Sequence, residues 1–221
     1  MVAVGPDGKV GMSNPNVAEP IKKYPNENSM NICVYCASSA RIDPIYFEAT
    51  ERLAKEFVRA KVNVVYGGGA IGLMGRLADT VIAEGGTIKG VIPRFMHEIE
   101  WTHPRLTEVV LVDTMHERKA KFIENIDALV ALPGGTGTLE ELLEAMTLKR
   151  LGQFMKPIVV LNTNGYYAPL KAMLEKCVTE RFMKDKHLSM WSFVSKPEDV
   201  LSTIRQTPDW DKNAIRFAVV Q

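Results

Sequence analysis

The residues best suited to chemistry stand together in one segment, PGGTGTLEE, which runs from Pro133 to Glu141. Its glycines free backbone N–H groups that can surround an anion, and the N-terminus of a following helix would add partial positive charge. The hydroxyls of Thr136 and Thr138 can donate hydrogen bonds to the same anion. The segment therefore predicts a phosphate site. It is not a P-loop, because no Lys-Ser/Thr pair follows the glycines.

Glu141 brings a carboxylate to this segment, and two interpretations of it are open. The spacing of Thr138 and Glu141 fits a capping box, in which both side chains would serve only the end of a helix. The alternative is an active-site carboxylate in the first helical turn, acting on whatever the loop binds. Glu140 and Glu144 are more typical of a solvated helix face.

Arg118 is the second candidate for chemistry. It lies with Lys119 in the segment MHERKA, at the expected start of a helix, where the helix dipole disfavours cations. It also falls on the apolar side of that helix, three residues after Met115 and four before Phe122. A guanidinium in such a place requires an anionic partner. An internal salt bridge, a bound phosphate or a catalytic carboxylate would each supply one.

A second glycine-rich segment, YGGGAIGLMG, covers residues 66–75 and contains the G-x-G-x-x-G pattern of dinucleotide-binding loops. Its context argues against a dinucleotide-binding loop, because it follows the second expected strand and not the first. The next strand ends in Ile-Pro-Arg at 92–94, with no acidic residue for a ribose hydroxyl. Close approach of another ligand and tight packing of helix on sheet are the alternatives. The turn at residues 36–39 either faces a polar ligand or is a simple turn.

Short apolar runs alternate with helical segments from residue 31 onward. This alternation predicts a parallel sheet with right-handed crossovers and strands covered on both faces. We therefore predict an α/β fold with a single doubly wound parallel sheet, Rossmann-like, with helices on both faces. Ligands should bind beyond the carboxyl ends of the strands. Strands are expected at 32–36, 62–66, 87–92, 108–112, 128–132, 157–161 and 193–194, and helices at 44–60, 72–84, 115–125, 138–151, 167–180 and from 197.

The chain is expected to have three parts. Residues 1–29 are rich in Gly, Pro, Asn and Lys without apolar periodicity, which predicts a disordered arm or an artificial leader. Residues 30–206 would form a Rossmann-like nucleotide-binding catalytic domain, and residues 207–221 a C-terminal tail. Within the domain, residues 93–107 are expected to be irregular.

Composition argues against several classes of protein. A net charge of +1 gives no reason to expect nucleic acid or a membrane as a partner. Three cysteines in a chain that is 46% hydrophobic argue against a disulfide scaffold and favour the cytoplasm. Cys33 and Cys36 have C-x-x-C spacing, but on a strand they would point to opposite faces as buried small side chains. The four histidines form no metal-ligand pattern, so no metal is expected.

The motifs together resemble those of the LOG ("lonely guy") family, which is often mislabelled as lysine decarboxylase. Residues 133–141 match the family signature PGGxGTxxE, residues 115–119 match its second motif, and residues 66–75 also look like the family's. The resemblance implies a Rossmann-like homodimer, or an assembly of dimers, with no cofactor. It implies hydrolysis of the N-glycosidic bond of cytokinin riboside 5′-monophosphate or AMP, releasing the free base and ribose 5-phosphate.

The same resemblance implies roles for individual residues. Arg118 and Glu141 would be the catalytic pair. Ala37, where relatives usually carry Gly, and Thr136, often Tyr in plant members, depart from the family and leave the preference for prenylated or plain adenine open. The implied substrate-binding residues are Ser38, Gly68, Gly69, Glu100, Lys119, Gly134, Gly135, Thr136, Gly137, Thr138, Leu139, Glu140 and Thr147.

The implied reaction passes through an oxocarbenium-like sugar, as in glycoside hydrolysis. Glu141 would stabilise that charge or orient the attacking water, and Arg118 would anchor the substrate and keep Glu141 ionised. The acid for the departing base is not identified, since arginine is a poor proton donor. The alternatives are a non-catalytic nucleotide sensor or carrier, a nicotinamide enzyme, and a pyridoxal phosphate decarboxylase, for which no positioned lysine with an acidic partner is evident.

Overall fold

The computed structural model describes residues 29–99 and 101–218. In this part of the chain, a seven-stranded sheet has the order β4-β3-β2-β1-β5-β6-β7, and every neighbouring pair is parallel. The predicted parallel, doubly wound sheet is therefore confirmed. The strands are β1 (Asn31–Tyr35), β2 (Asn63–Tyr66), β3 (Thr87–Pro93), β4 (Glu108–Val112), β5 (Ala128–Ala131), β6 (Ile158–Leu161) and β7 (Ser192–Val194).

The strand order reverses beside β1, which pairs with β2 on one side and β5 on the other. The chain after β1 therefore turns one way across the sheet, and the chain after β5 turns the other way. The two loops diverge and open a crevice at the carboxyl ends of these strands, which is where such sheets bind ligands. Two segments with predicted chemistry, residues 36–39 and 133–138, directly follow these two strands.

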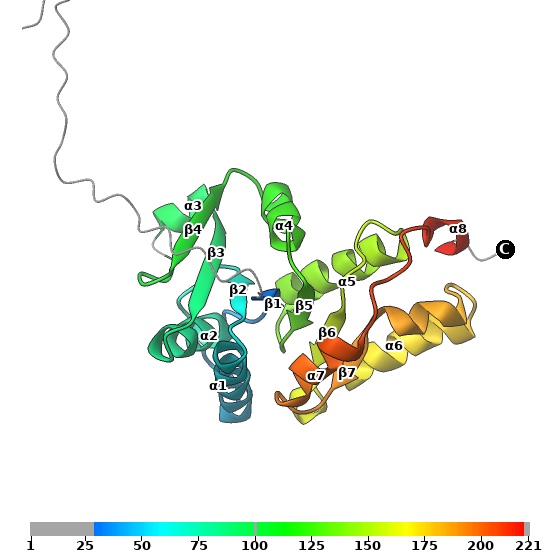
Figure 1. The fold of residues 1–221 in the computed structure, drawn as a ribbon, viewed down its shortest axis with the longest axis horizontal. Helices are drawn as coiled ribbons and strands as arrows, with labels where there is room; N and C mark the ends of the chain where they lie inside the picture. Colours follow the sequence, from blue (N-terminus) through cyan, green and yellow to red (C-terminus); the bar gives the residue numbers. More distant parts are fainter. Residues whose placement is uncertain (1–28, 100, 219–221) are drawn as a thin grey trace, which may run out of the picture.

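Helices cover both faces of the sheet, as the sequence predicts (Figure 1). One face carries α1 (Pro44–Arg59), α2 (Gly72–Ala83) and α7 (Asp199–Gln206). The other carries α4 (Met115–Ile123), α5 (Thr136–Arg150) and α6 (Ala168–Thr179). Shorter elements are α3 (Arg94–Glu98), η1 (Thr163–Gly165), η2 (Asp185–Met190) and α8 (Ile215–Ala218).

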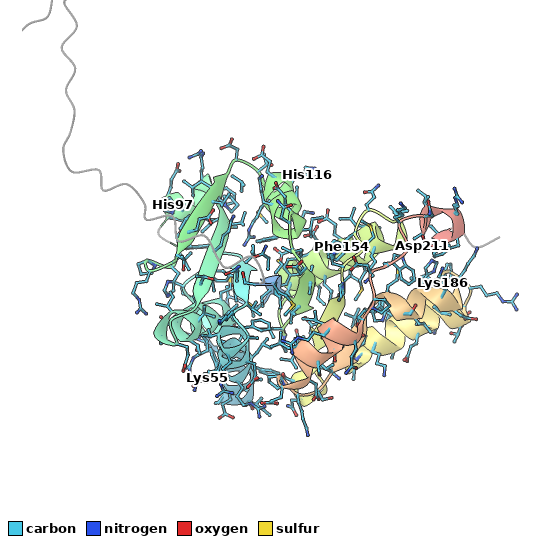
Figure 2. The ribbon with its side chains drawn as sticks, viewed as in Figure 1. Lys55, His97, His116, Phe154, Lys186 and Asp211 are labelled. Carbon is cyan, nitrogen blue, oxygen red and sulfur yellow. The ribbon has the colours of Figure 1, made fainter. Side chains whose placement is uncertain are left out.

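Figure 2 shows His97 and His116 at one end of the molecule, where α3 and α4 follow β3 and β4, with Lys55 of α1 at the opposite end. No helix of the described ranges has both the length and the apolar composition needed to cross a membrane.

Alternate side chains of the central strand β1 enter two separate cores. Ile32 and Val34 pack under α1 and α2, whereas Cys33 and Tyr35 pack under α4 and α5. Cys36 belongs to the first core, so the two cysteines lie on opposite faces, buried and free, as predicted. Burial raises the pKa of both thiols, which keeps them protonated and unreactive.

The helix boundaries depart from the sequence expectation in several places. Helix α5 begins at Thr136, so Thr138 lies inside its first turn and does not cap it. The predicted capping box of Thr138 and Glu141 is therefore wrong. The stretch at 93–107 contains α3, the helix expected from 197 begins at Asp199, and the expected irregular tail contains α8. Of the predicted arm, residues 1–28 lie outside the described residues.

Lys149 of α5 is a buried charge in the core beneath this helix. Its side chain is 1% exposed, and its ammonium donates a hydrogen bond to the carbonyl of Lys156 at 2.7 Å. Burial lowers the pKa of Lys149 to about 8, against the small opposing effect of Asp209. The folded state therefore disfavours the charged form.

This burial makes stability depend on pH in a defined direction. Because the folded pKa of about 8 lies below the model-peptide value of 10.5, the ammonium opposes folding below pH 8. This penalty fades as the pH rises toward 10.5. Lys149→Met removes this penalty, so its gain in unfolding free energy over the wild type should be larger at pH 7 than at pH 10. We expect a difference between the two gains of roughly 2 kcal/mol. Urea unfolding of both proteins at the two pH values measures this difference, and a pH-independent difference would contradict it.

Candidate active site

A cavity of about 540 Å³ opens at the carboxyl ends of the central strands. The loops after β1, β2 and β5 line it, together with residues of α3, α4 and α5. It therefore occupies the crevice that the strand order creates. A second cavity, of about 300 Å³, lies at the other end of the strands and contains none of the predicted site residues. The candidate site is the first of the two.

The segment predicted to bind phosphate forms the N-terminus of α5. Gly135 is the residue before the helix, and no side chain caps this end. The first hydrogen bond of the helix runs from the N–H of Leu139 to the carbonyl of Gly135 at 3.0 Å. The N–H groups of Thr136, Gly137 and Thr138 therefore have no acceptor within the helix. Because these residues line the cavity, the helix end is arranged to receive an anion.

A glycine is required at position 134 for this arrangement. A Cβ atom there would lie 2.1 Å from Oγ1 of Thr138, whose side chain is buried beneath the loop. A larger residue would therefore push the loop away from the first turn of the helix. At Gly135 and Gly137, a Cβ atom would meet nothing within 4 Å, so these two positions leave open space.

Two tyrosines hold the loop from behind, and sequence reasoning did not find them. The hydroxyl of Tyr166 donates to the carbonyl of Gly134 at 2.6 Å, and that of Tyr167 donates to the carbonyl of Leu132 at 2.7 Å. Both lie between η1 and α6, and they are remote in sequence from the loop. Tying down these carbonyls fixes the loop that leads into α5.

Arg118 and Glu141 meet across the floor of the cavity, although they come from α4 and α5. Nη1 of Arg118 lies 3.6 Å from Oε1 of Glu141, and the two side chains are only 8% and 13% exposed. The prediction that Arg118 needs an anionic partner is confirmed, and the partner is Glu141. The guanidinium also donates to the carbonyls of Val91 and Gly67, each at 3.1 Å. It lies over the ring of Phe122, 4.9 Å from the ring centroid.

The environment of this pair sets the charge of Glu141. Burial raises the pKa of Glu141 to about 7, because the carboxylate is removed from water, and the guanidinium of Arg118 opposes this rise. Burial also lowers the pKa of Arg118 from its ordinary value, and Glu141 counteracts that effect. Glu141 can therefore gain or lose a proton near neutral pH while Arg118 stays charged.

The second glycine-rich segment supports the pair. Its Gly67 provides the carbonyl that holds Arg118, and a Cβ atom at this position would lie 2.4 Å from Nη2 of the same arginine. Gly72 begins α2 with a φ of 68°, and a Cβ there would collide with the backbone of Ser38 and Ser39. At these two positions glycine permits close packing around the cavity, against the side chain of Arg118 and the loop after β1.

The opposite wall of the cavity is apolar and was also missed. Met74 of α2, Met96 of α3 and Trp101 line it, together with Ile71 and Ile92. Trp101 is 54% exposed, so it forms the rim of the opening. Thioether and indole groups of this kind accommodate flat or branched apolar ligands. The cavity thus combines an anion-binding end, a buried carboxylate and an apolar wall.

The predicted substrate-binding residues divide into two groups. Those that line the cavity are Ser38, Gly69, Gly135, Thr136, Gly137, Thr138 and Glu140. The others that the structure describes stand behind the lining or on the helix surface: Gly68, Lys119, Gly134, Leu139 and Thr147. Glu100 lies outside the described residues.

The second group has clear local partners. The ammonium of Lys119 bridges Glu140 at 2.5 Å and Glu144 at 3.1 Å, on the surface that links α4 to α5. Leu139 packs in the core under α5. The hydroxyl of Thr147 donates to the carbonyl of Leu143 in its own helix. These contacts fix the helices that carry Arg118 and Glu141.

Comparisons with known proteins agree with the family resemblance predicted from the motifs. A family model described as "Possible lysine decarboxylase" matches residues 74–204. The cytokinin riboside 5′-monophosphate phosphoribohydrolase LOG5 of Arabidopsis thaliana is 43% identical over 166 residues, covering 75% of this chain and 72% of that protein. A second relative, the cytokinin riboside 5′-monophosphate phosphoribohydrolase LOG7 of Arabidopsis thaliana, is 45% identical over 152 residues, covering 69% of this chain and 70% of that protein.

Among solved structures, the molybdenum cofactor carrier protein of Chlamydomonas reinhardtii has a TM-score of 0.63 at 17% identity, covering 81% of this chain and 98% of that protein. At this identity the likeness concerns the fold alone. Fold and cavity together define a Rossmann-like α/β protein with a ligand crevice at the reversal of its strand order. The extent and identity of the sequence matches show more: the chain belongs to the LOG family.

The tyrosine behind the phosphate loop provides a direct test of the anion site. Tyr166→Phe removes only the hydroxyl that holds the carbonyl of Gly134, so the protein should remain folded. Because one hydrogen bond is worth about 1 kcal/mol, we expect affinity for inorganic phosphate to fall by about fivefold. Isothermal calorimetry with phosphate measures this change.

The matched control for this test is Tyr46→Phe. The Tyr46 ring packs against Tyr166 with centroids 6.0 Å apart, but its hydroxyl does not hold the loop. We expect it to bind phosphate like the wild type. Equal losses in the two variants would show that the bond from Tyr166 to Gly134 is not what positions the loop.

Proposed function

We propose that this protein is a phosphoribohydrolase acting on adenine-type nucleoside 5′-monophosphates, such as cytokinin riboside 5′-monophosphate or AMP. The reaction would release the free base and ribose 5-phosphate. The relatives are named cytokinin riboside 5′-monophosphate phosphoribohydrolases, which supports this substrate class. The proposal needs no cofactor.

One observation carries the proposal: a buried carboxylate faces the cavity beside an uncapped helix end. Glu141 and the first-turn residues Thr136 to Thr138 line the same cavity. The helix end suits a 5′-phosphate, and the carboxylate suits the positive charge that develops on a sugar when its N-glycosidic bond breaks. The apolar wall at Met74 and Trp101 suits an adenine-type base, with or without an apolar substituent.

The residues have separate roles in this proposal. Backbone N–H groups at 136–138 and the hydroxyls of Thr136 and Thr138 hold the phosphate. Glu141, as a carboxylate, stabilises the oxocarbenium-like sugar or orients water for attack on C1′. Arg118 keeps Glu141 ionised and polarises the substrate. Lys119 and Glu140 hold α4 against α5 and so support the pair.

The bond changes balance without a second substrate. The electron pair of the C1′–N bond goes to the base, and the oxygen of a water molecule forms the new bond to C1′. In sum, that water supplies a hydroxyl to ribose 5-phosphate and a proton to the base nitrogen. With a pKa of about 7, Glu141 is well matched to accept the proton of the attacking water at neutral pH.

We also propose that the protein works in the cytoplasm as a homodimer or an assembly of dimers, without nucleic acid or a membrane as a partner. Family membership is the main support for the dimer. Phe95 and Ile99, at the two ends of α3, are more than half exposed and offer apolar surface for a second copy. The balanced charge of the chain supports the absence of nucleic acid and membrane partners.

Base release by the wild type and its loss in Glu141→Gln test the proposed reaction. The amide keeps the size of the side chain and removes its charge, so the fold and phosphate binding should survive. We expect hydrolysis of AMP and of isopentenyladenosine 5′-monophosphate to fall about 100-fold or more. Chromatography of the released base measures the rate. Nucleotide binding without base release by the wild type would favour a nucleotide sensor or carrier instead.

The pH dependence of the reaction follows from the raised pKa of Glu141. Because the carboxylate form is required, kcat/KM should fall about tenfold per pH unit below pH 7 in the free enzyme. Arg118→Met removes the charge that lowers this pKa, so the remaining activity should decline from a higher pH than in the wild type. An unchanged midpoint in Arg118→Met would assign the acid limb to another group.

A further inference from the structure

A buried histidine outside the cavity holds the segment that forms the apolar wall. Between Arg94 and Leu111, His103 is the one buried side chain among the described residues. Helix α3, which supplies Met96, has no buried residue at all, and Trp101 is 54% exposed. The side-chain attachment of residues 94–107 therefore centres on His103, which is 4% exposed, with the partly buried Leu106 packed against the core nearby.

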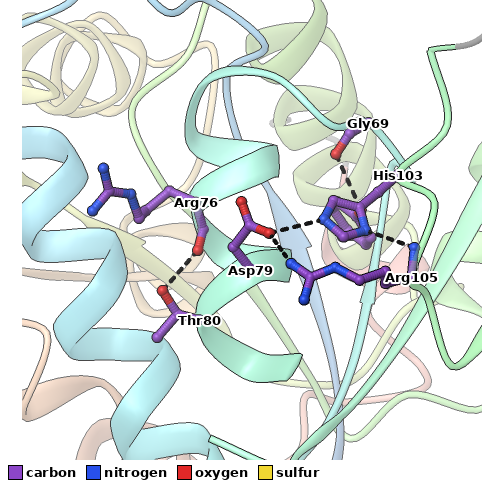
Figure 3. Close-up of polar contacts among 7 residues, drawn as sticks. Gly69, Arg76, Asp79, Thr80, His103 and Arg105 are labelled. Carbon is purple, nitrogen blue, oxygen red and sulfur yellow. Dashed lines mark hydrogen bonds and ion pairs between the residues drawn. The ribbon is translucent and has the colours of Figure 1, made fainter. Parts of the chain in front are cut away.

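Both nitrogens of the His103 ring have partners. The N–H of Arg105 donates to Nδ1 at 3.2 Å, so Nδ1 is an acceptor and the proton sits on Nε2. Nε2 in turn lies 3.2 Å from Oδ1 of Asp79, on α2. Figure 3 shows the Asp79 carboxylate between the imidazole of His103 and the guanidinium of Arg105, whose Nη2 lies 2.7 Å from the same oxygen.

The backbone around His103 is joined directly to the glycine loop after β2. The N–H of His103 donates to the carbonyl of Gly68 at 2.8 Å, and the N–H of Ala70 donates to the carbonyl of Trp101 at 3.2 Å. Between these bonds, Thr102 and Gly69 form an antiparallel bridge. A short strand pairing thus places Trp101 at the cavity, and the ring of His103 fixes it to α2.

We infer that His103, held by Asp79, is a positioning residue for the base-binding wall, and that it determines affinity for the base without touching the substrate. We call Asp79 and His103 the clamp. The clamp lies outside the cavity lining, whereas Trp101, Gly69 and Ala70, which it fixes, belong to the lining. The phosphate site on α5 is held by other residues, Tyr166 and Tyr167, and so is independent of the clamp.

This independence gives a readout that general destabilisation would not produce. AMP carries both phosphate and base, whereas ribose 5-phosphate lacks the base. Loss of the clamp should therefore weaken binding of AMP and leave binding of ribose 5-phosphate unchanged. The inference rests on the proposed function for its choice of ligands, but it is tested by binding and does not require turnover.

The first experiment compares variants of the carboxylate, which is mostly exposed and can be changed without opening the core. Asp79→Ala removes the partner of His103, and we expect the Kd for AMP to rise about tenfold with no change for ribose 5-phosphate. Asp79→Asn retains an acceptor oxygen and should restore most of the affinity. Calorimetry with the two ligands measures both constants.

Arg105→Gln is the matched control, because Arg105 contacts the same carboxylate oxygen from an exposed position. An exposed ion pair contributes little, so this variant should bind AMP like the wild type. If Arg105→Gln weakens AMP binding as much as Asp79→Ala does, the ion pair between Asp79 and Arg105 is responsible and the inference is overturned.

The second experiment is a double-mutant cycle that links the clamp to the indole. Trp101→Ala should raise the Kd for AMP by itself, and adding Asp79→Ala should then have little further effect, because the side chain that the clamp positions is already gone. Additive losses would overturn the inference. If the wild type binds both ligands but releases no base, the proposed reaction fails while the clamp remains testable.

Discussion

Burial of an ion pair sets the conditions for the rest of the site. Removing Arg118 and Glu141 from water costs more than their attraction returns unless further polar groups satisfy them. Arg118 receives two backbone carbonyls and an aromatic face. Within the described residues, no hydrogen bond reaches the Glu141 carboxylate, and its partner is the guanidinium in an ion pair at 3.6 Å. Its carboxylate keeps free acceptor capacity toward the cavity, and burial, which Arg118 offsets only in part, raises its pKa to about 7.

The loops around the pair share one physical device, in which a side chain ties down a backbone carbonyl. Arg118 holds Gly67 and Tyr166 holds Gly134. Fixed carbonyls give loops a defined geometry before any ligand arrives, so binding need not spend free energy on ordering them. Glycine is needed at both positions, because a Cβ atom would strike the guanidinium in one case and Thr138 in the other.

Local patterns were enough to predict the frame of the molecule. Short apolar runs located all seven strands, and their alternation with helices predicted that the sheet is parallel. The unusual place of Arg118 on an apolar helix face correctly predicted a buried cation with an anionic partner. These features are encoded within a few residues of each other, so a sequence displays them directly.

Features that depend on distant contacts were not predictable in the same way. Spacing alone left open whether Thr138 is a cap, but the helix begins at Thr136 after an uncapped glycine. Helices α2 and α6 also begin without a side-chain cap, so what marks the end of α5 as an anion site is the cavity that its first turn lines. Tyr166 is 32 residues from the carbonyl that it holds, and no periodicity marks such a bond.

The apolar wall shows how the fold divides stability from specificity. Buried strands and helices carry the cores, whereas Met96 and Trp101 of the wall belong to a largely exposed segment, which is attached by backbone bonds to the glycine loop and by the buried side chain of His103. Segments with few buried contacts have low local stability and can change with little effect on the whole fold. A polar anchor such as His103 fixes one geometry, because its two nitrogens must both find partners. The pair Arg118 and Glu141, in contrast, is built into helices on the sheet, so the base-binding wall can vary while the chemistry stays in place.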